Sequence, residues 1–192
     1  MVNIVLASAS IRRQELLERL TDRFLIMPAS FDEDSVIYNG SCSNYVMELS
    51  LGKADVVAKK LGEPSLVIGC DTVVSLDGAI LGKPSDYNQA FEMLKMLSGK
   101  KHQVYSGITL INTETNKTIS DFVLTDVKFS ELSKDDINKY IKTGEPMDKA
   151  GAYGIQGLGG VFVEEIHGCY YNVVGFPLNK LKKMILEMGV NL

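Results

Sequence analysis

The stretch SLVIGCDTVVSLDGAILGKP, residues Ser65 to Pro84, contributes most to the prediction of the fold. Its first part, up to Cys70, is a nearly continuous apolar run, which is typical of a strand buried on both faces. Asp77-Gly78 then separates two apolar segments, and this dipeptide favours a tight β-hairpin turn. The stretch therefore predicts a buried strand followed by a hairpin.

Segments on both sides of this stretch alternate between strand and helix patterns. Further strands are expected at residues 4–7, 24–27, 103–112, 118–129 and 161–166. Helices are expected at residues 12–20, 44–61, 86–97, 135–142 and 177–188. Because a second hairpin is expected around TETNK, residues 113–117, the sheet cannot be purely parallel. The sequence predicts an α/β fold with a mixed β-sheet and flanking helices, in a single domain over residues 1–192.

Size and composition are those of an ordinary globular chain. The 192 residues are 45% hydrophobic and 23% charged, with a net charge of −4, which argues against a general nucleic-acid binder. No apolar run approaches the roughly 20 residues of a membrane span, and the N-terminus lacks the basic segment of a signal peptide. The cysteines, Cys42, Cys70 and Cys169, form neither a disulfide framework nor a zinc pattern. We expect a cytoplasmic protein without nucleic-acid or membrane partners.

A second informative stretch is LASASIRRQELL, residues Leu6 to Leu17, which predicts a strand end, a turn and a helix start. With Ser10 as the N-cap, Arg12 and Arg13 fall in the first helical turn, where the dipole disfavours each cation by about 0.3–1 kcal/mol. One interpretation is a solvated surface pair. The other is a phosphate site, in which the helix N-terminus and the guanidinium groups bind the anion. The hydroxyls of Ser8 and Ser10 would add donors.

Two lysines are further candidates for binding an anion. Lys53 shares one face of its predicted helix with apolar residues such as Val46 and Leu49, so it must snorkel, pair with an acid or bind a ligand. Because Lys53→Met adds an apolar residue to an apolar arc, we expect it to leave the melting temperature unchanged or raise it. Lys83, in the motif LGKP, is either an exposed loop lysine or a ligand contact.

Acidic residues occur at two positions suited to chemistry. Asp71 follows the buried strand, at the edge where α/β proteins place their ligands, although turn formation is also common for Asp. A haloacid-dehalogenase phosphatase would need a second Asp where Val73 stands. Glu33 lies in the acidic segment Asp32 to Asp34, which is either a solvated charge run or a source of oxygen ligands for Mg²⁺.

The segment GEPMDKAGAYGIQGLGG, residues Gly144 to Gly160, is rich in glycine and has no periodicity. An aperiodic loop longer than about 12–15 residues is usually functional or disordered, and its apolar residues, including Tyr153, argue against disorder. The glycines do not open a helix after a strand, so they are not a dinucleotide fingerprint. A backbone that approaches a flat ligand closely, with the Gln156 amide as donor and acceptor, fits this segment better.

Taken together, LASASIRRQELL, GCDTVV, LGKP, GEPMDKAGAYGIQG and YYNVVGFPL resemble the Maf family of nucleoside triphosphate pyrophosphatases, in the family's order over nearly the whole chain. One departure is Ile11, where the family usually has proline, so the helix start is less pre-organised. The resemblance implies hydrolysis of a nucleoside triphosphate to monophosphate and pyrophosphate, with a divalent cation (Mg²⁺, Mn²⁺ or Co²⁺).

The resemblance also assigns roles to residues. The general base falls on Asp71, which could act directly or as a metal ligand, and the acidic residue after the second strand falls on Glu33. The phosphate-site cations fall on Arg12, Arg13, Lys53 and Lys83. The specificity positions fall on Arg12, Thr72 and Gln156. The branch of the family with Asp-Thr and Ile-Gln-Gly favours dTTP and UTP, whereas a sister branch prefers 7-methyl-GTP.

The fold implied by the resemblance is an elongated mixed sheet with two lobes around a cleft, as in inosine-triphosphatase-like proteins. Family members are often homodimers, and their ascribed tasks include removal of non-standard nucleotides and restraint of septum formation. A different class of function is a nucleotide-binding regulator of division with little turnover, which would keep Arg12, Arg13 and Gln156 but would not need Asp71. The sequence leaves this alternative open.

Overall fold

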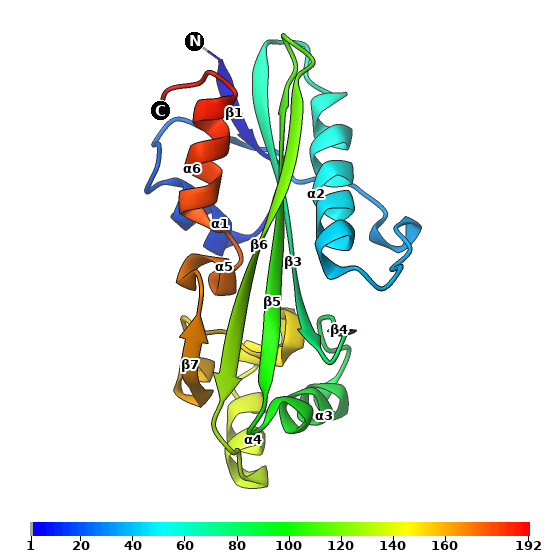
Figure 1. Ribbon diagram of the computed structural model, residues 1–192, viewed down its shortest axis with the longest axis vertical. Coiled ribbons are helices and arrows are strands. Elements are labelled where there is room, and N and C mark those ends of the chain that lie inside the picture. The colour runs from blue at the N-terminus through cyan, green and yellow to red at the C-terminus, as the bar shows by residue number, and fades with distance from the viewer. Residues whose placement is uncertain (1) are drawn as a thin grey trace. The chain divides into compact units, whose positions relative to one another are not determined.

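The computed structural model describes residues 2–192 (Figure 1). The chain divides into two compact units. The first, called here the terminal unit, consists of the residues up to Asp71, Ser106–Val123 and Gly175–Leu192. The second, called here the inserted unit, consists of Thr72–Tyr105 and Leu124–Val174. The prediction of a single domain stays a prediction.

Within the described residues, the strands form one seven-stranded sheet with the order β2-β1-β3-β5-β6-β7, and β4 pairs with β3. Strand β1 pairs in parallel with β2 and with β3, whereas β3 pairs with β4 and β6 with β7 in antiparallel fashion. The predicted mixed sheet is therefore confirmed. The strands are β1 (Asn3–Leu6), β2 (Leu25–Ile26), β3 (Ser65–Leu76), β4 (Ala79–Leu81), β5 (Lys101–Asn112), β6 (Thr118–Phe129) and β7 (Val163–His167).

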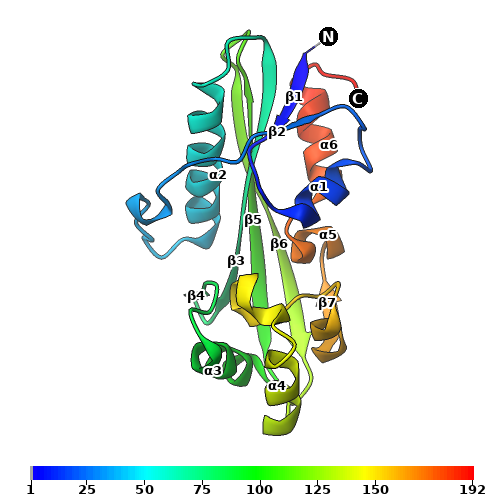
Figure 2. The ribbon, with the colours of Figure 1, turned by 180° about the vertical axis from the view of Figure 1, so that it is seen from behind.

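In the terminal unit, helices cover the strands on two sides. Figures 1 and 2 show α2 (Cys42–Ala58) on one side, and α1 (Ile11–Leu17) and α6 (Leu178–Glu187) on the other. Helix α2 touches the sheet with its backbone, because a Cβ at Gly69 or Gly107 would lie 2.2 Å from a carbonyl oxygen of the helix. These glycines thus set how closely α2 approaches β3 and β5.

In the inserted unit, α3 (Tyr87–Leu97) and α4 (Lys134–Ile141) contact each other beside a chain of short 3₁₀ helices. These are η2 (Glu145–Asp148), η3 (Ala150–Ala152) and η4 (Leu158–Phe162), and they occupy the glycine-rich segment that was predicted to be aperiodic. Phe129, Tyr153 and Phe162 are among the residues of the apolar core of this unit. A further short helix, α5 (Tyr170–Val174), was not predicted.

Most expected elements are present, with ends displaced by local chemistry. Helix α2 begins earlier than expected because the Ser41 side chain caps it by accepting from Asn44 N. The predicted hairpin turn is confirmed: Asp77 and Gly78, at φ 52° and 82°, connect β3 to β4. Strand β7 begins later than expected because η4 takes its first residues. Among the described residues, no helix combines the length and the apolar character that a membrane crossing requires.

Candidate active site

In the terminal unit, Lys53 brings two carboxylates together. Its Nζ lies 2.5 Å from Asp71 Oδ1 and 2.9 Å from Glu33 Oε1. The side chains of Lys53 and Asp71 are only 14% and 10% exposed, whereas that of Glu33 is 55% exposed. Of the options that the sequence left open for Lys53, pairing with an acid is the one the structure shows.

The packing of α2 explains why these side chains meet. The helix is held against β3 at Gly69, and this places Lys53 beside the strand that carries Asp71. On the outer side, a Cβ at Gly52 would lie 2.2 Å from the ring of Phe31. Phe31 therefore packs on the backbone of α2, and the short helix η1 (Glu33–Ser35) that follows brings Glu33 to Lys53.

The electrostatic surroundings match this geometry. Burial disfavours the ammonium of Lys53, but Asp71 and Glu33 outweigh burial and raise the pKa of Lys53 above its ordinary value. Burial, followed by the charges of Asp71, Glu33 and Asp34, raises the pKa of the nearby Tyr45 phenol. The cluster therefore has a negative field that favours cations.

Arg13 has contacts that the sequence did not indicate. Its Nε donates to Gly175 O at 3.0 Å, and its Nη1 donates to Cys70 O at 2.7 Å and to Ser8 Oγ at 3.4 Å. These bonds connect α1 with the end of the apolar half of β3 and with the segment before α6. Arg13 thus has a structural role in addition to any role in binding phosphate.

The start of α1 agrees with the prediction in position. Ser10 is the N-cap residue, but its side chain makes no capping hydrogen bond, and the first turn contains no acidic residue. Instead, the backbone N–H of Ser10 donates to Ser8 Oγ at 3.2 Å. Ser8 is 8% exposed, and Arg12 is half-buried in the first turn. A role of these residues in binding phosphate stays a prediction.

The other predicted site residues belong to the inserted unit. Thr72 directly follows Asp71 in β3 and is half-buried. Lys83 is exposed after β4, and Gln156 is exposed between η3 and η4. The assignment of both sets of residues to one site stays a prediction.

The glycine-rich segment is organised by protein side chains that the sequence analysis did not single out. The Glu145 carboxylate accepts from Tyr140 Oη at 2.9 Å, Leu158 N at 2.8 Å and Gly159 N at 3.2 Å. A Cβ at Gly157 would lie 2.4 Å from Glu145 Oε2. This glycine makes room for Glu145. The close approach of this backbone to a flat ligand stays a prediction. An acid at the start of a glycine-rich loop was the one available signal.

His102 is a second residue that organises the inserted unit. It is 1% exposed, and its Nε2 is 2.9 Å from the hydroxyl of Tyr153. Edge-on aromatic contacts with Phe129 and Tyr153 enclose the ring. Burial lowers the pKa of His102 to about 4, so the ring is neutral near pH 7 and supports the core of the inserted unit.

The carboxylates fit a divalent cation in part. Within residues 2–192, no group of three or more His, Cys, Asp or Glu side chains is arranged to hold a metal ion. However, Asp71 and Glu33 converge on one ammonium. Magnesium is commonly bound by one or two carboxylates together with substrate phosphates, so a carboxylate pair of this kind fits that chemistry.

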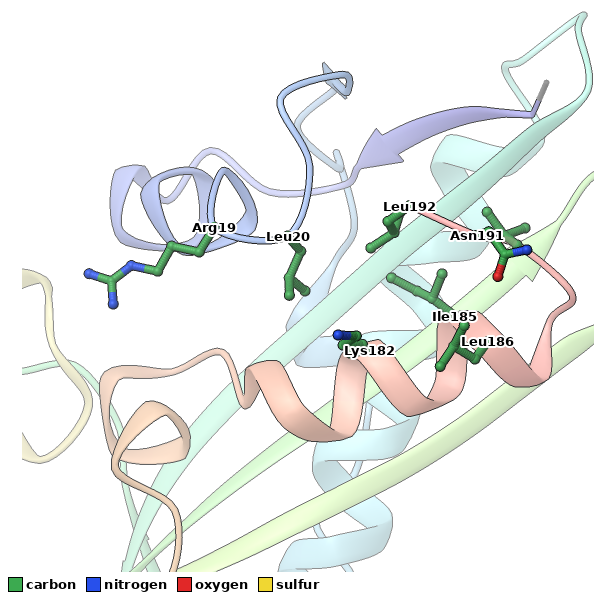
Figure 3. A pocket seen from close by; sticks show the side chains of 8 residues that line it. Arg19, Leu20, Lys182, Ile185, Leu186, Asn191 and Leu192 are labelled. Carbon is green, nitrogen blue, oxygen red and sulfur yellow. The ribbon is translucent and has the colours of Figure 1, made fainter.

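A cavity of about 200 Å³ lies elsewhere in the terminal unit, by α6 and the C-terminus (Figure 3). None of its lining residues is a predicted site residue. They are Arg19, Leu20, Lys182, Ile185, Leu186, Val190, Asn191 and Leu192. The candidate active site is therefore defined by the side-chain contacts around Lys53 and not by this cavity.

Comparison with known proteins identifies the class. The family model described as Maf-like protein matches residues 3–188, and the chain belongs to the Maf family. Proteins named dTTP/UTP pyrophosphatase from Clostridium botulinum (strain Kyoto / Type A2) and Clostridium novyi (strain NT) are each 59% identical to it, over 100% of both chains. A solved structure of a HAM1 protein from Coxiella burnetii has TM-score 0.51 at 19% identity, covering 97% of this chain and 100% of that chain, which indicates a related fold.

Proposed function

We propose that the protein is a nucleoside triphosphate pyrophosphatase that hydrolyses dTTP and UTP to the monophosphate and pyrophosphate. Full-length relatives with that name at 59% identity support the activity. The single structural observation that carries the proposal is the contact of the nearly buried Lys53 with Asp71 and with the more exposed Glu33. A carboxylate beside a cation suits hydrolysis of a phosphoanhydride, because the carboxylate can orient water and the cation can offset developing negative charge.

In this proposal the terminal unit performs the chemistry. Asp71 orients or deprotonates the water that attacks the α-phosphorus. Lys53, Arg12 and Arg13 offset the charge that develops on the leaving pyrophosphate, and Ser8 and Ser10 supply hydroxyl donors. Arg13 can do this only while its bonds to the carbonyls of Cys70 and Gly175 hold its guanidinium in place.

A divalent cation (Mg²⁺, Mn²⁺ or Co²⁺) would be held by Asp71 and Glu33 together with substrate oxygens. When bound, the cation neutralises phosphate charge and polarises the reacting phosphoryl group. Lys53 keeps the two carboxylates close to each other when no cation is present. The choice of metal, a homodimeric state and a cytoplasmic location stay predictions.

Selection of the base belongs, in this proposal, to Thr72 and Gln156, with Arg12 as a further contact and Lys83 as a phosphate ligand. The pairing edge of uracil or thymine presents acceptor, donor and acceptor, and a glutamine amide can match two neighbouring groups. A site built on such hydrogen bonds rejects mispaired substrates strongly, because its polar groups would be left unpaired. We expect ATP and GTP to be poor substrates.

Turnover of a nucleotide panel by the purified protein with Mg²⁺ or Mn²⁺, followed by phosphorus NMR, tests the proposal. We expect dTTP and UTP to be the best substrates, with pyrophosphate and monophosphate as products. Orthophosphate and diphosphate would mean attack at the γ-phosphorus and would contradict the assignment. A preference for 7-methyl-GTP would keep the reaction class but refute the roles of Thr72 and Gln156.

Asp71→Asn serves as the matched variant, because it keeps the size of the side chain and removes its charge and basicity. We expect it to abolish turnover while dTTP still binds. Near-normal kcat would exclude Asp71 as base or metal ligand. Binding without turnover in the wild type would instead favour a nucleotide-binding regulator of cell division.

A further inference from the structure

The segment that carries Gln156 is a tight turn. Gly157 N donates to Gly154 O at 3.3 Å, so Ile155 and Gln156 are the central residues of a turn over 154–157. Gln156 is exposed at this position. The direction of its amide therefore depends on how firmly the two ends of the turn are held.

Both ends of the turn are held by one pair of side chains. At the first end, Gly154 N donates to the hydroxyl oxygen of Tyr140 at 3.1 Å. After the second end, Leu158 N donates to Glu145 Oε2 at 2.8 Å. The Tyr140 hydroxyl in turn donates to Glu145 Oε1 at 2.9 Å, so the two anchors are themselves bonded to each other. Tyr140 is 4% exposed and belongs to α4, which gives the pair a fixed base.

The glycines of the turn are fitted to this pair and leave no room for other side chains. A Cβ at Gly157 would lie 2.4 Å from Glu145 Oε2, and one at Gly159 would lie 2.6 Å from the Tyr140 hydroxyl. At Gly154 a Cβ would lie 2.6 Å from Lys149 Cε. Lys149 is itself tied back, because its Nζ donates to Glu145 O at 2.8 Å. The backbone thus wraps closely around Glu145.

The ionised carboxylate of Glu145 suits the three hydrogen bonds that it accepts. Burial disfavours the carboxylate, but the N–H groups of Leu158 and Gly159 and the Tyr140 hydroxyl outweigh burial and lower the pKa of Glu145. The carboxylate is therefore ionised near pH 7 and can accept all three bonds. A carboxamide has one acceptor oxygen and an amino group that only donates, so it cannot satisfy this set of donors.

We infer that Glu145, supported by Tyr140, is a positioning residue for base selection: it fixes the turn that presents Gln156 to the nucleotide. The inference rests on the proposed function, because Gln156 selects the base only if a nucleotide is the substrate. Glu145 touches no substrate in this assignment. It acts through the backbone of residues 154–159.

Glu145→Gln is the decisive variant. We expect the ratio of kcat/KM for dTTP to that for GTP to fall about tenfold, because hydrogen bonds to a charged group are lost where the turn is anchored. The KM for dTTP should rise more than kcat falls. In a Gln156→Ala background, Glu145→Gln should alter this ratio by less than about twofold. The two substitutions are not additive, because Glu145 acts on the ratio only through Gln156. Tyr140→Phe should act in the same direction with a smaller effect.

Asp136→Asn is the matched control in the inserted unit. Asp136 completes the capping box of α4 with Ser133, so its loss lowers stability without touching the turn. We expect this variant to melt at a lower temperature and to keep the dTTP to GTP ratio. An unchanged ratio in Glu145→Gln, or an equal loss of ratio in Asp136→Asn, would refute the inference. The inference would also be refuted if Glu145→Gln lowered the dTTP to GTP ratio equally in the wild-type and in the Gln156→Ala background.

Binding of dTTP and GTP in the presence of a chelator separates the inference from the proposed function. A wild type that binds dTTP preferentially but does not turn over with metal would refute the proposed activity alone. In that case Glu145→Gln must lose the binding preference if the inference holds. A wild type without preference in both assays would refute the inference together with the role of Gln156. If Glu145→Gln does not fold, Tyr140→Phe gives the deciding ratio.

Discussion

Replacing Lys53 by Met should destabilise the protein, although the sequence alone predicts the opposite. The side chain of Lys53 lies in an apolar arc of α2, but its ammonium is bonded to Asp71 and Glu33. Methionine keeps most of the volume and removes the positive charge. Asp71, whose side chain is 10% exposed, would then be a nearly buried carboxylate without its partner.

The size of the expected loss of stability follows from the burial of Asp71. Removing one partner of a buried ion pair costs about 3–5 kcal/mol, and the 55% exposure of Glu33 favours the lower end, about 3 kcal/mol. In a chain of this size 1 kcal/mol corresponds to roughly 2–4 °C, so we expect the melting temperature to fall by about 6–12 °C. Thermal unfolding followed by circular dichroism at pH 7, without nucleotide or metal, measures it.

Lys59→Met is the matched control, because Lys59 forms an ion pair on the same helix with Asp55. Their side chains are 73% and 41% exposed, and exposed helix pairs four residues apart contribute about 0.3–0.5 kcal/mol. Adding Asp71→Asn to Lys53→Met should recover part of the loss, since the stranded charge is removed. If Lys53→Met melted within about 2 °C of the wild type, as the control should, the structural importance of the ion pair would be refuted.

Further predictions concern other parts of the fold. Arg13→Met should lower the unfolding free energy by about 2 kcal/mol, because charge-assisted bonds to buried carbonyls are lost; urea unfolding measures it. Because the pKa of His102 is about 4 when folded and about 6.5 when unfolded, the unfolded state gains a proton first as pH falls; stability should drop by about 2 kcal/mol between pH 7 and 5. This drop should be smaller in His102→Gln. Gly52→Ala should displace Phe31 and cost about 1–3 kcal/mol, because the added Cβ overpacks the contact.

Each of these expectations has a result that contradicts it. Wild-type stability in Arg13→Met would mean that its carbonyl contacts contribute nothing measurable. An equal dependence on pH in wild type and His102→Gln would assign the acid sensitivity to other groups. Unchanged stability in Gly52→Ala, with Phe31→Ala as the comparison, would show that the loop before α2 adapts without cost.

The alternation of strands and helices could be predicted from the sequence because each element carries its own pattern. The apolar run before Asp71 and the Asp77-Gly78 turn are local signals, and the structure confirms both. The 3₁₀ helices between Gly144 and Phe162 have no such pattern. Glu145 and Tyr140 hold the backbone of Gly154, Leu158 and Gly159 in this segment, and these contacts cannot be derived from periodicity.

For the candidate site, too, the sequence indicated some features, and only the tertiary structure shows the others. The position of Lys53 on an apolar face left snorkelling, pairing with an acid and ligand binding open. Its acids lie in other elements, and only the tertiary fold selects them. For Arg13 the sequence offered surface exposure or phosphate binding, whereas the structure adds backbone carbonyls as acceptors. Backbone acceptors are present at every residue, so no residue type could have indicated them.

The contacts of Lys53 also join the structural and the catalytic interpretations of this residue. The cluster holds one ammonium and two carboxylates, so it retains more negative than positive charge. In the proposed function, that excess would favour a divalent cation at Asp71 and Glu33, and the ammonium offsets the repulsion between the two carboxylates. A lysine that served catalysis alone would not need two acids, and one that served stability alone would not need to pair with Asp71, which follows the apolar run of β3. Its position between Asp71 and Glu33 meets both requirements.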